Sequence, residues 1–476
     1  MTSALNTDFY ELTMAQGYWK RGDGGAAVFD VFFRRHPFKG GYSVFAGLEP
    51  LLRALEDFRF GPEDLAYLES LGMFEKGFLD YLERFRFRGD IWAMSEGELV
   101  FPQEPIARVE AEIVEAEIVE GFILNYLNFQ SLIATKSARV WLASNRGPIM
   151  EFGLRRAQGP DGGLSASRAA YIGGVAGTSN ALAGRLYGIP VMGTMAHSWV
   201  MSFPNEREAF DAYAEIYPDK TVYLIDTYDT LKSGIKNAIA SGRSLVARGK
   251  RFGVRLDSGD IDYLSREVRK ELDAAGLADA FIVVSNELDE EIIEHLVSDG
   301  TPVDQWGVGT HLVTGGSEAS FTGVYKLAAV ERSGELVPTM KFSDNPEKST
   351  NPGVKQAFRL YGRDGLALAD LIALADEAEP AIGAERTVYH PSTDWRHICV
   401  SPAEVRPLLS RAMAGGRVVP GLPSLADARA KLAAELGRFD STYLRLLNPH
   451  VYKVSISEKL RELKLGFIER YMKGDK

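Results

Sequence analysis

The sequence predicts an α/β protein with a (β/α) barrel in its central part. Between about residues 150 and 315, short apolar runs alternate with stretches of helical periodicity, which is the pattern of successive βα units on a parallel sheet. The regularity of this alternation favours a barrel over an open sheet. Strands are expected at 190–194, 221–226, 251–256, 281–285 and 303–308, and helices at 205–216, 228–241, 260–275 and 287–298.

The regions on either side of this central part mix strand and helix patterns. Residues 7–19 carry an apolar stripe at helical spacing, which predicts a helix capped by Thr7 or Asp8. The repeated EAEIV of 110–119 is interpreted as a strand that runs into a helix. Further strands are expected at 26–33 and 358–361, and further helices at 121–136, 367–378, 425–437 and 457–473.

Two changes of pattern divide the chain into three parts. We expect an N-terminal α/β domain over 1–130, the barrel over 131–335 and a C-terminal region over 336–476. The last region opens on a polar stretch with two prolines at 341–353. No low-complexity linker separates the parts, so the C-terminal region is expected to pack on the other two.

Composition excludes several classes of partner. The net charge of −11 over 476 residues argues against nucleic acid and against an anionic membrane surface. No run of about 18 apolar residues is present, so no transmembrane helix is expected. The single cysteine, Cys399, permits no intrachain disulfide, and the polar N-terminus lacks an apolar signal core. We therefore expect a cytoplasmic protein.

Polar residues follow the predicted strands at the point where each strand ends. In a parallel α/β architecture the C-terminal strand ends share one face, where active sites are built. One face is therefore expected to collect a histidine, carboxylates, an arginine and a glycine-rich loop. The residues concerned are Arg155, His197, Asp226, Asp257, Ser285, Asn286 and the stretch 307–310.

His197 stands just past a predicted strand, in the segment Gly-Thr-Met-Ala-His-Ser at 193–198. Small neighbours such as Gly193 and Thr194 allow close approach by a phosphate. Neutral imidazole is a good nucleophile near neutral pH, which suits phosphoryl acceptance. The alternative is a structural histidine bonded to the backbone, which is the commoner role of an isolated histidine.

Arg255 and Asp257 are two residues apart at the end of a predicted strand, so both side chains point to the same side. A carboxylate there can accept hydrogen bonds from ribose hydroxyls or stabilise positive charge at an anomeric carbon. The alternative is that Asp257 or Ser258 simply caps the helix that follows.

Two further segments suggest ligand contacts. Gly307, Gly309 and Thr310 offer backbone N–H groups and a hydroxyl that can hold a phosphate, although a tight turn is the commoner role of such a segment. Phe152 and Arg155 combine an aromatic ring with a guanidinium, which suits a planar aromatic carboxylate. The alternative for Arg155 is one half of a surface basic pair.

Taken together, these segments resemble those of the nicotinate phosphoribosyltransferases. The likeness extends from about residue 5 to about residue 360 and weakens towards the C-terminus. Each segment alone is weak, whereas their combination in family order is highly specific. The matching segments are TDFYELTMAQGYW at 7–19, EFGLRRAQGPDG at 151–162, GTSN at 177–180, GTMAHSWV at 193–200, RLDSGD at 255–260, WGVGTHLVT at 306–314 and NPEKSTNPG at 345–353.

The resemblance implies a fold, a reaction and partners. The fold is an irregular (β/α) barrel of the type II phosphoribosyltransferase kind with an N-terminal α/β domain, usually in a homodimer. The reaction transfers phosphoribosyl from phosphoribosyl pyrophosphate to nicotinate, giving nicotinate mononucleotide and pyrophosphate for NAD salvage. ATP hydrolysis is coupled to this transfer, and Mg²⁺ is expected as a cofactor, with unknown ligands.

The resemblance also assigns roles to individual residues. His197 matches the histidine that ATP phosphorylates, and Arg255 and Asp257 match contacts to ribose and phosphate. Gly307, Gly309 and Thr310 match the loop that holds the 5′-phosphate. The resemblance thus implies that these six residues carry out catalysis and bind phosphate groups.

The remaining carried-over residues concern the substrates. Tyr10, Phe152 and Arg155 match the nicotinate site, with Tyr10 lent by the second subunit. Thr178 and Ser179 occupy the place where nicotinamide-using relatives present an aspartate, and hydroxyls there favour the acid over the amide. Thr194 is counted with the substrate-binding residues, and Lys348 is expected to contact pyrophosphate or ATP.

Three alternatives remain for the function. An enzyme on the same scaffold could use nicotinamide, which Ser179 disfavours, or quinolinate, which the His197 segment disfavours because quinolinate enzymes do not couple to ATP. A catalytically silent nucleotide-binding regulator would not need the combination of His197, Asp257 and Arg155. An unrelated barrel enzyme acting on a phosphorylated sugar is the third.

Overall fold

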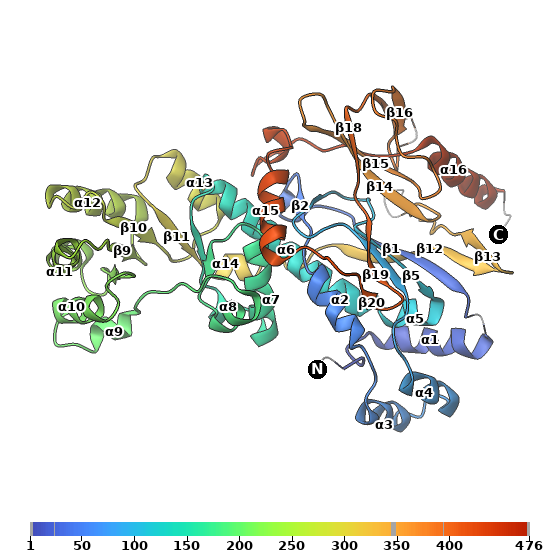
Figure 1. The fold of residues 1–476 in the computed structure, drawn as a ribbon, viewed down its shortest axis with the longest axis horizontal. Helices are drawn as coiled ribbons and strands as arrows, with labels where there is room; N and C mark the ends of the chain where they lie inside the picture. The colour runs from blue at the N-terminus through green and yellow to red at the C-terminus, as the bar shows by residue number, and fades with distance from the viewer. Residues whose placement is uncertain (1–2, 23, 344–348, 394, 474–476) are drawn as a thin grey trace. The chain divides into compact units, whose positions relative to one another are not determined.

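The structure is a computed structural model that describes residues 3–22, 24–343, 349–393 and 395–473. The chain forms two compact units, which are treated separately below (Figure 1). The first unit comprises residues 1–132 and 320–476, and the second comprises residues 133–319. The expected boundaries at 130 and 335 and the three-part division remain predictions. None of the described helices has the length and apolarity needed to cross a bilayer.

The second unit is built on a six-stranded parallel sheet in which β9, β10 and β11 lie side by side, followed by β6. Among the described residues no backbone pairing joins the two edge strands, β7 and β8, so the sheet is a curled half-barrel. The strands are β6 (Ile149–Glu151), β7 (Gly177–Thr178), β8 (Val222–Leu224), β9 (Gly253–Leu256), β10 (Phe281–Val284) and β11 (Gln305–Val308).

Helices follow the strands of this sheet in the predicted alternation. Asn205, Asp260 and Asp289 each accept a backbone N–H at a helix start, which explains why the helices begin where they do. The helices are α7 (Gly159–Ile172), α8 (Ala181–Tyr187), α9 (His197–Met201), α10 (Glu206–Ile216), α11 (Ile235–Ala247), α12 (Ile261–Ala274), α13 (Glu290–Ser298) and α14 (Thr310–Val313), with short turns η2 (Leu154–Arg156) and η3 (Thr230–Gly234).

Two predicted elements of the second unit differ from the structure. The strand expected at 190–194 is wrong, because only Val191 forms a bridge, to Thr178. Around this bridge the Pro190 carbonyl accepts from the Thr178 N–H at 3.0 Å, and the Met192 N–H donates to the Thr178 carbonyl at 2.9 Å. Pairing goes no further because the partner strand β7 ends at Thr178 and the chain enters α8 at Ala181. The helix expected from 228 begins later. Asp229 caps the π-helical turn η3 by accepting from the Leu231 and Lys232 N–H groups, and the α-helix starts at Ile235.

The first unit contains two larger sheets that join residues from both ends of the chain. β1 (Ala26–Phe33) lies between β5 (Ala107–Glu112) and β12 (Gly323–Arg332), and both pairings are antiparallel. The same seven-stranded sheet includes β3 (Asp90–Ala93), β13 (Glu335–Pro338), β19 (Ser410–Ala414) and β20 (Arg417–Val418). The six-stranded sheet contains β14 (Lys355–Tyr361), β15 (Ala367–Leu374), β16 (Arg386–Tyr389), β17 (His397–Val400), β18 (Glu404–Pro407) and β21 (Val454–Ile456), and β2 (Ser43–Val44) pairs with β4 (Leu99–Val100).

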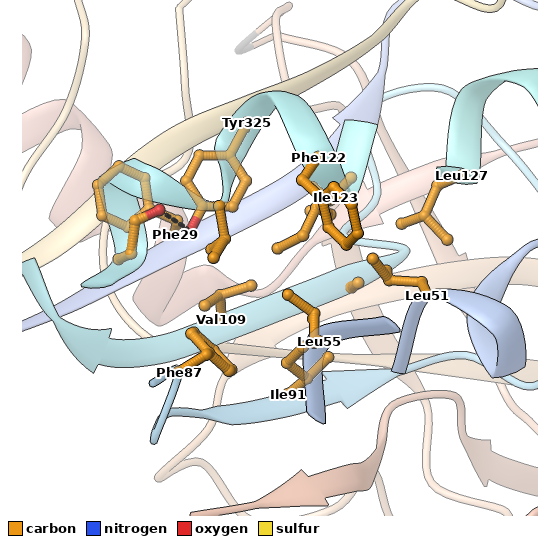
Figure 2. Packing of buried hydrophobic residues seen from close by; sticks show 14 of the residues in the cluster. Phe29, Leu51, Leu55, Phe87, Ile91, Val109, Phe122, Ile123, Leu127 and Tyr325 are labelled. Carbon is orange, nitrogen blue, oxygen red and sulfur yellow. Dashed lines mark hydrogen bonds between the residues drawn. The ribbon is translucent and has the colours of Figure 1, made fainter. Parts of the chain in front are cut away.

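The helices between residues 9 and 143 pack a large apolar core against the seven-stranded sheet (Figure 2), whereas Leu460 of the C-terminal helix packs on the six-stranded sheet. Phe29 and Tyr325 stack with ring centroids 4.5 Å apart, and the Tyr325 hydroxyl donates to the Ala116 carbonyl at 2.9 Å. The helices are α1 (Phe9–Arg21), α2 (Leu48–Glu56), α3 (Pro62–Ser70), α4 (Lys76–Glu83), α5 (Ile113–Ile118), α6 (Glu120–Ala143, which continues into the second unit), α15 (Leu425–Glu435) and α16 (Glu458–Met472), with turns η1 (Pro37–Lys39) and η5 (Ser441–Tyr443).

Most predicted elements of the first unit are confirmed, with one clear error. The segment 367–378, expected as a helix, is strand β15 between β14 and β21. Its alanines and leucines favour a helix on propensity alone, yet its core residues are buried on both faces of the sheet. At α1, Asp8 occupies the N-cap position without a side-chain capping bond, whereas the Thr7 hydroxyl donates to the Ile118 carbonyl at 2.8 Å.

A buried ion network links residues distant in sequence inside the first unit. Arg359 is fully buried and donates to both carboxylate oxygens of Asp370, at 2.9 and 2.7 Å. It also reaches Glu98 at 2.5 Å and Glu435 at 3.2 Å. Removing one partner would leave a buried charge unpaired, which typically costs about 3–5 kcal/mol.

Buried carboxylates also gather where α1 meets α5 and α6. Glu11 and Glu117 are 0% and 5% exposed, and one oxygen of Glu117 has no hydrogen-bond partner in the described residues. Burial, reinforced by the charge of Glu120, raises the pKa of Glu117 to about 7. Burial also raises the pKa of Glu11 to about 7, although the Thr7 hydroxyl and the Gly121 N–H oppose the rise.

These two carboxylates make stability depend on pH. The native state keeps protons that the unfolded chain, with ordinary carboxyl pKa values, has released, so the free energy of unfolding falls as pH rises from about 4.5 to about 7. We predict that Glu117→Gln flattens this slope and stabilises the protein at pH 8 by about 2 kcal/mol.

Urea denaturation at pH 5, 6, 7 and 8 measures the effect. Glu69→Gln, a change at an exposed carboxylate of α3, is the matched control and should alter stability by less than about 0.5 kcal/mol. A Glu117→Gln protein with the same pH slope as the parent would contradict the assignment.

Candidate active site

The carboxyl edge of the half-barrel carries the residues that the sequence singled out. Because its strands are parallel, all their C-terminal ends meet at that edge. Phe152 follows β6, Thr178 ends β7, Asp226 follows β8 by one residue, Asp257 follows β9 and Gly309 follows β11. The structure therefore places these predicted site residues at one edge of one sheet.

His197 is the first residue of α9 and lies between two oxygen groups from neighbouring strand ends. Its Nδ1 is 3.1 Å from the Thr227 hydroxyl, and its Nε2 is 3.6 Å from the Asp257 carboxylate. The side chain is 41% exposed, so a ligand can reach it. The contacts are to side chains, so the alternative of a histidine bonded only to the backbone is not what the structure shows.

Asp257 is held by its neighbours on the sheet rather than acting as a helix cap. The Ser285 hydroxyl, from the end of β10, donates to Asp257. The Asp257 backbone N–H donates to Asp226 at 3.0 Å, and Asp226 also accepts from Ser258 at 2.5 Å. The cap of α12 is Asp260 instead. Asp257 is therefore fixed at the centre of a hydrogen-bonded row that runs from Ser285 to Asp226.

Arg255 points to the same edge, as the spacing of two residues predicts. It donates to the Thr194 hydroxyl, and its buried Nε has no partner in the described residues. Burial lowers the pKa of Arg255, Asp257 and Asp226 oppose that shift, and the like charge of Arg155 adds to it. Arg155 and Arg255 thus concentrate positive charge in a protein whose net charge is −11.

The end of β11 packs against the Phe152 ring. A Cβ at Gly307 would meet that ring at 2.9 Å and the Ser285 Cβ at 3.2 Å, so only glycine fits there. A Cβ at Gly309 would likewise meet the Phe152 carbonyl oxygen at 3.2 Å. Thr310 begins α14, and its hydroxyl lies 3.3 Å from Glu287. The glycines therefore serve close packing, and they leave the turn backbone bare of side chains.

Thr178 and Ser179 differ in how their side chains are placed. Thr178 is 1% exposed, and its hydroxyl donates to Glu151 at 2.5 Å and accepts from the Asn180 N–H at 2.9 Å. Ser179 is half-buried, and no side-chain hydrogen bond of its hydroxyl is formed within the described part of the chain. Of the pair, Ser179 is the one available to a ligand.

Two predicted residues lie outside this group. Tyr10 belongs to α1 of the first unit and is 47% exposed, and burial together with the nearby carboxylates of Glu120 and Glu11 raises its pKa. Lys348 lies outside the described residues.

Two residues that the geometry brings into the site were not predicted from the sequence. Thr227 contacts His197, and Glu151 holds the Phe152 turn. Thr227 directly follows the strand-end Asp226, and Glu151 directly precedes Phe152, so adjacency to a predicted site residue was the available signal.

The carboxylates of Asp226 and Asp257 are the groups here that suit a magnesium ion. One buried oxygen of Asp226 has no partner in the described residues, which leaves it available to a ligand. Among those same residues no cluster of three or more histidine, cysteine or acidic side chains could hold a metal by itself. Mg²⁺ is commonly bound by one or two carboxylates with substrate phosphates completing the shell, so the residues fit a metal that arrives with a phosphorylated substrate.

Three family models match the chain in sequence order. They describe the nicotinate phosphoribosyltransferase N-terminal domain at residues 5–128, the nicotinate phosphoribosyltransferase family at 148–363 and the C-terminal domain at 354–464. The chain belongs to the nicotinate phosphoribosyltransferase family. It is therefore an enzyme, and its likeness to the family extends into the C-terminal region, where the quoted segments had thinned.

Individual relatives agree with the family models. The chain is 41% identical to a nicotinate phosphoribosyltransferase of Bacillus subtilis, covering 96% of this chain and 93% of the relative. It is 38% identical to the human nicotinate phosphoribosyltransferase, covering 96% and 95%. The crystal structure of human nicotinic acid phosphoribosyltransferase superposes with a TM-score of 0.86 at 35% identity over 97% of this chain and 99% of that one. These comparisons confirm the fold class.

A more distant structure shows the same fold. A nicotinate-nucleotide pyrophosphorylase from Pyrococcus furiosus has a TM-score of 0.71 at 23% identity, covering 92% of this chain and 95% of that one. At this identity the likeness concerns the architecture alone.

The packing of Gly307 gives a stability prediction for this unit. Gly307→Ala places a methyl group against the Phe152 ring and the Ser285 Cβ, and overpacking of this kind costs about 1–3 kcal/mol. Thermal or urea denaturation measures the loss. Gly162→Ala in α7 is the control, since its Cβ would meet nothing closer than 3.8 Å. Equal stability of the two variants would show that Phe152 does not pack as described.

Proposed function

We propose that the enzyme transfers the phosphoribosyl group of phosphoribosyl pyrophosphate to nicotinate, with ATP hydrolysis coupled through phosphorylation of His197. The observation that carries this proposal is the grouping of His197, Asp257 and Arg255 at one sheet edge, with Phe152 and Arg155 after β6 at the same edge. The names of the relatives, nicotinate phosphoribosyltransferases from bacteria to human, support the choice of substrate.

The transfer breaks the bond between ribose C1 and the pyrophosphate oxygen, which leaves with the bonding electrons. The ring nitrogen of nicotinate then forms the new bond to C1. Because nicotinate is a weak nucleophile, C1 must carry substantial positive charge before attack. Asp257 is positioned to stabilise that charge, while Arg255 and Arg155 bind anionic groups of the substrates.

Nicotinate recognition is assigned to the β6 end. The Phe152 ring offers a face for the pyridine ring, and the Arg155 side chain is exposed and able to pair with the carboxylate. Ser179 presents a neutral hydroxyl where an acidic residue would repel a carboxylate. We also place Tyr10 of a second copy in this site, supported by its half-exposed position on α1, which makes a homodimer the working form.

Magnesium is expected with the phosphorylated substrates. Asp226 and Asp257 would hold it, and when bound it neutralises charge on the departing pyrophosphate. A phosphoryl group on His197 would add negative charge beside the same carboxylates, which favours a state with more bound cation. Phosphorylation by ATP would thereby strengthen cation binding at the substrate site.

The role of His197 is tested by its replacement. We predict that His197→Ala abolishes the rate enhancement by ATP and leaves slow transfer without ATP, because the sheet-edge residues remain while the phosphoryl acceptor is gone. Product formation from phosphoribosyl pyrophosphate and nicotinate is followed with and without ATP. Unchanged ATP stimulation in this variant would refute the phosphohistidine.

The substrate is tested on the parent enzyme. We expect nicotinate mononucleotide from nicotinate and no comparable product from nicotinamide or quinolinate, because Arg155 pairs with one carboxylate and Ser179 lacks the charge that would attract an amide. Product formation from nicotinamide alone would overturn the substrate choice. Binding of nicotinate without any product formation would contradict the proposed transfer and favour the catalytically silent nucleotide-binding protein.

A further inference from the structure

Glu151 is a fully buried carboxylate at the end of β6 that no step of the proposed reaction uses. It is 0% exposed and accepts from three groups in different parts of the second unit. These are the Gly153 N–H in the turn after β6, the Ser167 hydroxyl of α7 at 2.8 Å and the Thr178 hydroxyl of β7 at 2.5 Å. All three donors are neutral groups.

Two of these bonds, those from Gly153 and Thr178, fix segments that present a ligand group. Gly153 lies between Phe152 and the turn η2, which carries Arg155. Thr178 immediately precedes Ser179, and the Ser179 N–H donates to the Glu151 backbone carbonyl at 2.9 Å. The aromatic ring, the guanidinium and the free hydroxyl of the candidate nicotinate pocket therefore all stand on backbone that is tied to one residue.

Thr178 makes a further hydrogen bond besides that to Glu151. The Thr178 hydroxyl also accepts from the Asn180 N–H, and the Asn180 side chain caps α8 by accepting from Leu182 and Ala183 at 3.2 and 3.3 Å. With one donor and one acceptor contact, the hydroxyl already has partners on both sides. Thr178 is thus engaged inside the protein, although the family resemblance placed it among the substrate contacts.

We propose that Glu151 is a positioning residue of the nicotinate pocket, which acts through the Gly153 N–H and the Thr178 hydroxyl to set the spacing between Arg155 and Ser179. This inference rests on the proposed function. A carboxyl group suits the task because its two oxygens can accept from several donors at once. A misplacement of about 1 Å in a binding group is enough to reduce catalysis substantially.

The test uses a matched pair of substitutions in the full-length enzyme. Thr178→Val removes the hydroxyl and keeps the shape, whereas Thr178→Ser keeps the hydroxyl. We expect Thr178→Val to raise the KM for nicotinate about tenfold with the KM for phosphoribosyl pyrophosphate little changed. Thr178→Ser is expected to recover most of the nicotinate affinity. Melting temperatures are recorded for all variants.

Glu151→Gln provides a second route to the same contact. It is expected to raise the nicotinate KM as well. The double variant Glu151→Gln with Thr178→Val should raise this KM by much less than the product of the two single effects, because both substitutions affect the hydrogen bond between Glu151 and Thr178. Fully multiplicative effects, or equal increases in both KM values, would overturn the inference. If the parent enzyme forms no product from nicotinate, the proposed function fails instead.

Discussion

Parallel pairing of the strands in the second unit is the constraint on which the site depends. Because the four central strands run in the same direction, every loop that follows a strand emerges at the same edge. Residues separated by up to about 150 positions in the chain are therefore brought together without any long-range pairing of their own. The common strand direction brings the site residues together, and side-chain contacts such as that of Ser285 with Asp257 fix their positions.

Much of this arrangement was predictable because it repeats. β9, β10 and β11 with their helices follow a regular alternation, and their strand ends mark Arg255, Asp257 and Gly307 in the sequence. The strand predicted at 190–194 is wrong because its neighbour β7 ends at Thr178, so only one bridge can form. The helix predicted over β15 is wrong because burial on both faces of a sheet overrides the helical preference of alanine and leucine. That burial depends on tertiary structure and cannot be recognised from a short stretch of sequence.

The residues that support the site were harder to predict than those that face a ligand. His197 stands in a recognisable segment at the start of α9, whereas its partner Thr227 follows β8. Neither segment alone predicts that the two side chains are in contact. Glu151 has an acidic side chain at a position that sequence alone assigns to the surface as readily as to the core. Only the burial and the three converging donors reveal its role.

The insertion of one unit within the other has a consequence for how the chain is made. β1 needs β12, and Glu98 needs Arg359, so the first unit cannot be completed while only its opening 132 residues have left the ribosome. The half-barrel contains all of its own strands between residues 149 and 308 and can form earlier. During synthesis the half-barrel can therefore fold before the first unit is complete, while β1 still lacks β12 and Glu98 still lacks Arg359.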